Sequence, residues 1–307
     1  MSGMETFTLV PRGPFTLASS IRFLEGFAPA AYSGPQDAVL ELAFPVEGSW
    51  ETVGVRVRQD DGGKVTAEVV SPESPGAELM TAVRAQVERI LSLDVDGSGF
   101  PAVGERDPVV AGLQQRYPGL RPIGFWSPYE AAAWTIIGHR IRIRQAAAIK
   151  ARMAEQLGEP VEFGDRVVYA FPSPARLAAL ESFPGLGGRK PEWLRSVAVA
   201  ALDGQLDTAR LRELPRETAL KELKKLPGIG DFSSGLILLR GAGDPDAVSY
   251  HEPRLALAVA DAYGLPGPAT PEQLTEISES WRPYRTWVIL LLRTQQEISA
   301  ARALNCG

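Results

Sequence analysis

The hydrophobic pattern of the chain changes near residue 93, and this change limits the folds that are open to it. Three segments before that point are rich in β-branched residues and have the character of strands: VLELAF at 39–44, VGVRVRQ at 53–59 and KVTAEVV at 64–70. The turn sequence DDGG at 60–63 predicts that the last two segments pair as a hairpin. A helical pattern follows at 78–93, so we expect a small α+β domain over residues 1–93.

The patterns after residue 93 predict an almost wholly helical remainder. Ser127 and Pro128 begin one helix as its N-cap and first residue, Glu130 is placed to close a capping box, and the helix runs to Gly138. Further helices are expected from Ser173 and Pro174 onward, from Thr218 to Lys225, from Phe232 to Arg240, around 271–281 and over 284–304.

The composition excludes several classes of protein. The 307 residues are 45% hydrophobic and 22% charged, enough for a full core and two or three domains, and no apolar run is long enough to span a membrane. The only cysteine is Cys306 and the only histidines are His139 and His251, which excludes an intramolecular disulfide and makes a metal centre unexpected. We expect a cytoplasmic monomer without a resident metal or cofactor.

The net charge of −5 does not by itself predict nucleic-acid binding, but the basic residues are clustered. Residues 128–155 carry five basic side chains against Glu130 and Glu155: Arg140, Arg142, Arg144, Lys150 and Arg152. One interpretation is a charged helix face. Because arginine alternates with isoleucine over 140–144, we favour contact with double-stranded DNA through His139 and the arginines that follow it.

The segment LPGIG at 226–230 lies between two helical patterns. Gly228 and Gly230 can adopt backbone conformations closed to other residues, and they leave their amides unshielded. The first amides of the next helix point the same way, so hairpin and helix together form a site for a phosphate. We assign this grip to Pro227, Gly228, Ile229 and Gly230, with Ile229 and Leu226 as anchors in the core.

The alternative for this segment is a glycine-rich turn between two packed helices. Asp231, directly after the hairpin, suits a helix N-terminus but would repel a bound phosphate.

Several segments taken in order resemble the helix-hairpin-helix DNA glycosylases, in particular the bacterial 3-methyladenine DNA glycosylase II family. They are FLEGFAPA at 23–30, RDPVVAGLQQRYPGLRP at 106–122, FPGLGGRKPEWLRSVA at 183–198, LPGIG, RGAGDPDA at 240–247 and WRPYRTW at 281–287. The resemblance implies an α+β N-terminal domain like half of a TATA-binding protein, and then a mostly helical core in two lobes with the active cleft between them. One lobe comprises 94–127 and 244–307 and carries the candidate carboxylate; the other, 128–243, carries the hairpin.

The resemblance implies an enzyme that flips a damaged base out of the duplex and hydrolyses its N-glycosidic bond. The family places an aspartate about twenty residues after the hairpin, and counting back from Leu255 puts Glu252 at that position. Glu252 is therefore the candidate catalytic residue, with a solvated first-turn glutamate as the alternative. Asp244 and Asp246 are the other carboxylates that could serve, although both are typical of loops and caps.

The same resemblance places a polar pair after the first helix of the core, and here the pair is His139 and Arg140. Arg140 could fill the gap that a flipped base leaves. Bifunctional relatives carry a lysine where this chain has Phe232, so no lyase step is expected. In the family that the chain resembles, carbonyls of the hairpin often hold a monovalent cation, and the sequence leaves open whether this hairpin does.

The candidate base pocket comprises Phe232, Leu236, Trp281, Arg293 and His251. Relatives that remove cationic bases line this pocket with aromatic rings. Arg293 stands where the last aromatic is expected and would repel a cationic base, so a neutral or oxidised base or a bulky adduct is as plausible a substrate. Phe232 is interpreted either as a stacking platform or as a core residue. A DNA- or DNA-damage-binding protein that has lost the activity is the alternative function.

Overall fold

The structure, a computed structural model, describes residues 5–26, 32, 38–71, 74–248, 250 and 252–305. The N-terminal part consists of β1 (Glu5–Leu9), α1 (Leu17–Gly26), β2 (Leu40–Pro45), β3 (Thr52–Gln59), β4 (Val65–Val70) and α2 (Ala77–Ile90). The next elements are α3 (Pro101–Arg106), α4 (Pro108–Arg116), α5 (Pro128–Ile137), α6 (Ile143–Leu157), β5 (Pro160–Phe163), β6 (Arg166–Tyr169), α7 (Pro174–Ala178) and α8 (Lys190–Leu202). The last are α9 (Thr208–Glu213), α10 (Arg216–Leu223), α11 (Asp231–Leu236), the π-helix η2 (Ile237–Gly241), α12 (Pro253–Tyr263), α13 (Pro271–Glu279) and α14 (Arg285–Asn305).

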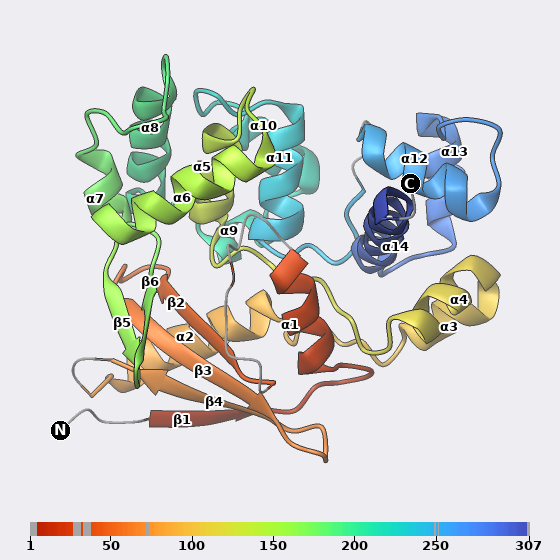
Figure 1. Ribbon diagram of the computed structural model, residues 1–307, viewed down its shortest axis with the longest axis horizontal. Coiled ribbons are helices and arrows are strands. Elements are labelled where there is room, and N and C mark those ends of the chain that lie inside the picture. Colours follow the sequence, from red (N-terminus) through yellow and green to blue (C-terminus); the bar gives the residue numbers. More distant parts are fainter. Residues whose placement is uncertain are drawn as a thin grey trace.

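The N-terminal strands form an antiparallel sheet in the order β1-β4-β3-β2, with α2 across one face (Figure 1). The predicted hairpin between β3 and β4 is confirmed: Gln59 pairs with Val65, and the amide of Asp60 donates to the carbonyl of Lys64 at 3.0 Å. Strand β1 was not predicted, because its sequence ETFTL has neither turn signals nor a long apolar run. This segment forms a strand because it pairs with β4, which is distant in sequence.

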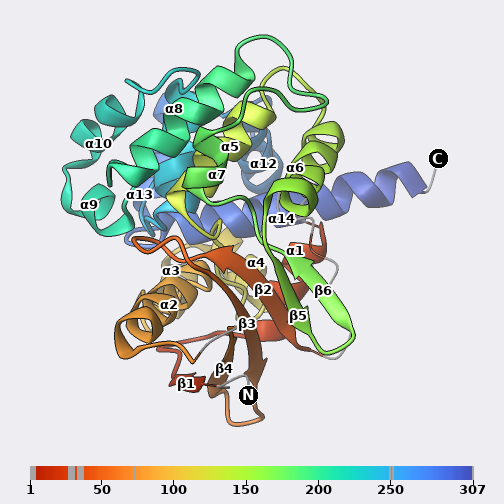
Figure 2. The same cartoon turned by 90° about the vertical axis from the view of Figure 1, so that its left-hand side faces the viewer.

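The prediction of an almost wholly helical remainder is wrong at β5 and β6. These strands form a hairpin that leaves the helical part and lies against the N-terminal sheet, as Figure 2 shows. Gly54 in β3 makes this approach possible, because a Cβ there would lie 2.4 Å from Val161 and 2.8 Å from the Phe163 ring. The hairpin is stabilised by a partner far away in sequence, so local patterns did not reveal it.

Two predicted details of the helices also differ. Ser127 caps α5 as expected, accepting from the amide of Glu130 at 3.1 Å, but the Glu130 carboxylate does not close a capping box. It pairs instead with Lys150 at 2.8 Å. The helix expected over 232–240 is α11, and its second half continues as the π-helix η2.

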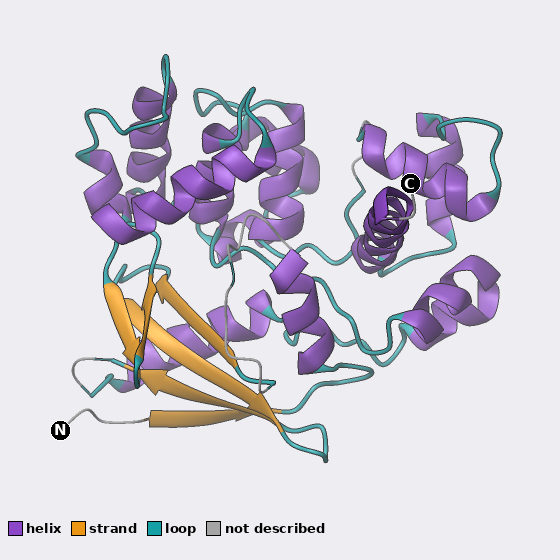
Figure 3. Cartoon of the chain, viewed as in Figure 1, coloured by secondary structure: helices purple, strands orange, loops and turns teal. Residues whose placement is uncertain are grey.

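The described residues form three large apolar cores and a small fourth one, between the β5–β6 hairpin and the N-terminal sheet. The first lies between α2 and the N-terminal sheet, the second inside the helices from α5 to η2, and the third joins α3 and α4 to α12, α13 and α14. Figure 3 shows the strands gathered at one end of the molecule, with α1 and α2 next to them and the other helices beyond. The division into 1–93, 128–243 and a lobe made of 94–127 with 244–307 stays a proposal.

Within the part of the chain that the structure describes, no helix has both the length and the apolar composition that crossing a membrane would require.

Candidate functional site: the hairpin, the arginine loop and Glu252

The hairpin at 226–230 is a tight turn between α10 and α11. Gly228 has φ +83°, in the left-handed region that favours glycine, and a Cβ there would lie 2.6 Å from the Trp193 ring. Ile229 is buried and Leu226 is half-buried against the same core, so both anchor the turn as expected. The helical core therefore fixes one side of the hairpin, while Pro227 and Gly230 on the turn are exposed.

Asp231 stands at the first position of α11 with 88% of its side chain exposed. Its carboxylate pairs with Lys224 from the turn before the hairpin, at 2.8 Å. Lys224 therefore offsets part of the repulsion that Asp231 would exert on a bound phosphate.

The loop between α5 and α6 presents the candidate DNA-contacting side chains. Arg140 has φ +56°, which is unusual for a residue with a side chain, and His139, Arg140, Arg142 and Arg144 are all exposed. The His139 ring meets Trp193 edge-on, with centroids 5.8 Å apart. Trp193 thus contacts this loop and also limits the space at Gly228, so it joins the loop to the hairpin.

The basic cluster is narrower than the sequence predicts. Lys150 is buried and ion-paired with Glu130, so it is not a surface cation. Arg152 is exposed and donates to the carbonyl of Pro184 at 3.2 Å. Arg140 and Arg142 of the loop and Arg144 in the first turn of α6 remain exposed, and we call this segment, 139–144, the arginine loop.

Glu252 is the N-cap residue of α12, but its side chain makes no capping hydrogen bond. Its Oε1 accepts from Nη1 of Arg293 at 2.5 Å, and the two side chains are 23% and 17% exposed. Arg293 also pairs with Glu297 at 3.2 Å, and its Nε is buried without a hydrogen-bond partner among the described residues. Glu252 is therefore held in place rather than free in solvent.

Arg240 adds a second positive charge near this pair. Its guanidinium donates to the carbonyl of Ile123 and lies 5.3 Å from the centroid of the Phe23 ring. Burial lowers the pKa of Arg240 to about 10, while the charges of Glu297 and Glu252 act in the opposite direction. Two carboxylates and two guanidiniums therefore share this region.

Asp244 and Asp246 hold the loop before α12 together. Asp246 pairs with Arg285 at 2.8 Å and with Arg282 at 2.7 Å. Asp244 accepts from the amide of Asp246 at 2.9 Å and pairs with Arg216 at 3.2 Å. Both carboxylates therefore stabilise this loop, and their assignment as alternative acids stays a prediction.

The candidate base-pocket residues lie in different environments. Phe232 is 59% exposed, so the core interpretation is wrong for it, whereas Leu236 is half-buried against the helical core. Trp281 is fully buried and donates to Asp107 and to the Tyr263 hydroxyl, so its assignment to an open pocket is also wrong. His251 and Cys306 lie outside the described residues.

Asp107 is a buried carboxylate whose hydrogen bonds join α4 to α12 and to the segment after α13, a role that was not predicted. Its Oδ1 caps α4, accepting from the amides of Val109 and Val110, and its Oδ2 accepts from the Tyr263 hydroxyl at 2.7 Å. Ser280 donates to the same oxygen at 3.0 Å. The aspartate before Pro108 was a signal for this cap.

Carboxylates and imidazoles in the described ranges are not grouped, three or more together, as a metal site requires. At the hairpin, the carbonyl of Leu226 already accepts from the amide of Ile229 at 3.1 Å. A monovalent cation at this turn stays a prediction.

No protein-family model matches the chain. Solved structures do match it along almost its whole length. The 3-methyladenine DNA-glycosylase from Archaeoglobus fulgidus aligns with a TM-score of 0.78 at 20% identity, covering 94% of this chain and 97% of that one. The Clostridium acetobutylicum 8-oxoguanine glycosylase/lyase, solved with double-stranded DNA, aligns with a TM-score of 0.66 at 17% identity, covering 97% and 98%. The fold is that of the helix-hairpin-helix DNA glycosylases.

The curated relatives with similar sequences are also named DNA glycosylases, in agreement with the fold. The chain is 30% identical to DNA-3-methyladenine glycosylase 2 of Escherichia coli (strain K12) over 181 residues, which are 56% of this chain and 59% of the relative. It is 24% identical to the DNA-3-methyladenine glycosylase of Bacillus subtilis (strain 168) over 204 residues, 65% of this chain and 67% of the relative. The chain is therefore similar in sequence to 3-methyladenine DNA glycosylases, which are among its homologues, and it has the fold of the helix-hairpin-helix DNA glycosylases.

Proposed function

We propose that this protein is a monofunctional DNA glycosylase of base excision repair, which binds double-stranded DNA, flips a damaged base and hydrolyses its N-glycosidic bond. The observation that carries the proposal is the placement of Glu252. It is a partly buried carboxylate at the start of α12, fixed by Arg293. The names of the curated relatives support the reaction type.

The chemistry needs a fixed negative charge beside the sugar. As the base departs, positive charge develops at C1′, and a carboxylate held in a partly dry site stabilises it. The same carboxylate can orient the incoming water and accept its proton. Glu252 is a partly buried carboxylate, and its hydrogen bond with Arg293 fixes its side chain, which supports this role.

The hairpin and the arginine loop supply the proposed grip on DNA. The exposed amides of the hairpin suit a phosphate, and exposed Arg142 and Arg144 suit the phosphates nearby. Arg140 projects from a left-handed backbone position on the same loop. It is the residue that we assign to the space left by the flipped base.

The substrate that fits best is a neutral or oxidised base. Phe232, 59% exposed, offers a ring face on which a base can stack. Arg293 carries a buried Nε–H without a partner among the described residues, and it opposes a cationic base such as 3-methyladenine. A base with a carbonyl oxygen would accept from Arg293 where a cationic base is repelled. Phe232 has no amine to form a Schiff base, so no lyase step is proposed.

One observation favours a second function. Arg293 neutralises Glu252 at 2.5 Å, and a carboxylate already paired to a guanidinium stabilises a developing positive charge less well. A protein that binds damaged DNA without cutting the glycosidic bond would keep the grip and tolerate this pair.

A panel of duplexes with one lesion each separates the two functions. Methylated, deaminated, oxidised and bulky-adduct bases would be incubated with the wild type and with Glu252→Gln, and abasic sites revealed by alkali. Strand breaks that appear with the wild type and fall at least about a hundredfold in the variant support the glycosylase. Binding to damaged duplexes without any break overturns the glycosylase and supports the binding protein. Glu297→Gln is the matched control, because it removes the other carboxylate paired with Arg293.

A further inference from the structure

Lys190 is a buried charge that none of the roles assigned above requires. It is the first residue of α8, only 8% of it is exposed, and its Nζ donates to the carbonyl of Ile137 at 2.9 Å. Ile137 is the last residue of α5, 53 residues earlier in the chain. The last carbonyls of a helix have no amide partner within that helix, so this ammonium closes the end of α5 just before the arginine loop.

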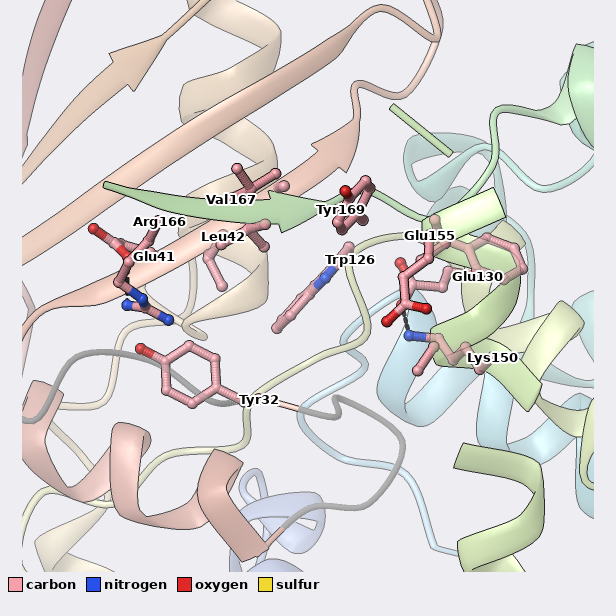
Figure 4. Close-up of a pocket in the computed structure, with 15 residues that line it drawn as sticks. Tyr32, Glu41, Leu42, Trp126, Glu130, Lys150, Glu155, Arg166, Val167 and Tyr169 are labelled. Atoms are coloured by element: carbon pink, nitrogen blue, oxygen red, sulfur yellow. Dashed lines mark hydrogen bonds and ion pairs between the residues drawn. The ribbon is translucent and has the colours of Figure 1, made fainter. Parts of the chain in front are cut away.

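This placement of a charge is unfavourable for the lysine. Burial lowers the pKa of Lys190 from its ordinary value, and the positive end of α8 also disfavours a cation, although the negative end of α5 offsets part of this. Lys150, which is buried as well, pairs with the carboxylate of Glu130 at 2.8 Å, the contact drawn as a dashed line in Figure 4. Lys190 has no carboxylate partner among the described residues. A charge buried in this way indicates a role other than packing.

The backbone that follows Ile137 is strained. Arg140, three residues further on, has φ +56°, a left-handed conformation that a residue with a side chain rarely adopts. Such a conformation persists only where the surrounding structure fixes it. Lys190 fixes the chain before Arg140. The start of α6 fixes it afterwards, since the amide of Ala146 donates to the carbonyl of Arg142 at 3.0 Å.

Trp193, one turn further along α8, joins the same loop to the hairpin. Residues three apart on a helix lie on the same face, so Lys190 and Trp193 act from one surface of α8. The Trp193 ring meets His139 edge-on, and it lies so close to Gly228 that a Cβ there would be 2.6 Å from it. One turn of α8 therefore contacts the end of α5, the arginine loop and the hairpin.

We propose that Lys190 is a positioning residue for the DNA grip: its ammonium holds the last turn of α5, and through it the backbone from which Arg140 enters the space left by the flipped base. The inference rests on the proposed function, because it concerns the same DNA contacts. Lys190 is buried and acts only through Arg140. Loss of its ammonium therefore misplaces Arg140 while the hairpin keeps its phosphate.

Fluorescence anisotropy with the full chain, an abasic duplex and the matching intact duplex tests this role. Lys190→Met keeps the length of the side chain and removes the ammonium. It is expected to lower the preference for the abasic duplex by about threefold or more, as Arg140→Ala does, with binding of the intact duplex within about twofold of the wild type. In the double variant with Arg140→Ala the preference should fall no further. Additive losses, or a wild-type preference in Lys190→Met, overturn the inference.

Ser92→Ala is the matched control, because Ser92 is also buried and donates to a backbone carbonyl, that of Pro122 at 2.6 Å. It should keep the wild-type preference, and an equal loss in both variants would be an effect of stability that overturns the inference. Lys190→Gln, whose neutral amide ends one atom short of the ammonium, replaces Lys190→Met if that variant does not fold. An unchanged preference in Arg140→Ala would instead overturn the assigned role of Arg140 in the grip, and this inference with it.

Discussion

Arg293 on α14 donates to the carboxylate of Glu252 at the start of α12, at 2.5 Å and across 41 residues of sequence. Both residues depart from the pattern that the resemblance implies, an aspartate and an aromatic ring. The structure shows that the two departures contact each other. Glu252 and Arg293 therefore replace the expected aspartate and aromatic ring as a contacting pair.

Replacing this cation should change which bases are released. We expect Arg293→Trp to raise the release of cationic 3-methyladenine relative to a neutral base by about tenfold or more, because two unit charges ~4 Å apart repel by about 4 kcal/mol at an effective dielectric constant of 20. The measurement is single-turnover base release from two matched duplexes. Glu297→Gln keeps both Arg293 and Glu252 and serves as control. A ratio unchanged in Arg293→Trp would remove Arg293 from substrate selection.

The arginine loop should account for part of the salt dependence of DNA binding. Arg144→Ala is expected to reduce the slope of log K against log salt by about 0.9, the value for one phosphate contact. Arg140→Ala should weaken binding to a duplex with an abasic site more than to an intact duplex, since Arg140 is assigned to the vacated space. Fluorescence anisotropy at several salt concentrations measures both. Arg84→Ala, on α2 and paired with Glu88, should change neither slope nor preference.

Substitution of Gly228 should lower DNA affinity more than substitution of a glycine with a similar φ elsewhere in the chain. Gly228→Ala is expected to lower DNA affinity about tenfold, because its Cβ would meet Trp193 and displace the turn from its phosphate. Gly204→Ala has a similar φ, +71°, but open space around its Cβ. It should show only the backbone strain, about 1–2 kcal/mol of unfolding free energy, with unchanged DNA binding. Equal DNA affinities of the two variants would contradict the assigned grip.

Tyr263 should contribute to stability in a pH-dependent way. Burial and the hydrogen bond to Asp107 raise the pKa of Tyr263 above its ordinary value. The neutral phenol is therefore favoured in the folded state, and its contribution is fully present below about pH 10 and lost as the pH rises further. Tyr263→Phe should lower the free energy of unfolding by about 1 kcal/mol at pH 7 and make its decline above pH 10 shallower.

Urea unfolding between pH 7 and pH 11 measures this difference. Tyr169→Phe, at a position that is 43% exposed, is the control and should leave the pH profile unaltered. A variant at position 263 with the same alkaline decline as the wild type would show that the phenol does not contribute to it.

Local signals predicted much of the fold. The alternating segment at 53–59 with its turn, the Ser127 cap and the hairpin anchored by Ile229 were all found where the sequence placed them. Each depends on neighbours within a few residues. Strands β1 and β5–β6 depend on partners tens of residues away, and short segments carry too little periodicity to reveal such a partner.

The candidate site was less accessible to sequence reasoning. Counting along the pattern of the resemblance pointed to Glu252 and Arg293, but their contact depends on how α12 and α14 pack. The burial of Trp281 depends on Asp107, which lies 174 residues earlier in the chain. Lys150 illustrates the same limit, because a lysine in a basic run reads as exposed until Glu130 is placed beside it.

The contact of Val161 and Phe163 with the sheet at Gly54 bears on how the chain can be shortened. These two side chains are buried only because the N-terminal sheet covers them. A fragment reduced to the helical part would carry them as an uncovered apolar edge on a two-stranded ribbon, which is a surface prone to aggregation. Truncation at residue 93 therefore requires polar replacements at 161 and 163 for the fragment to stay dispersed.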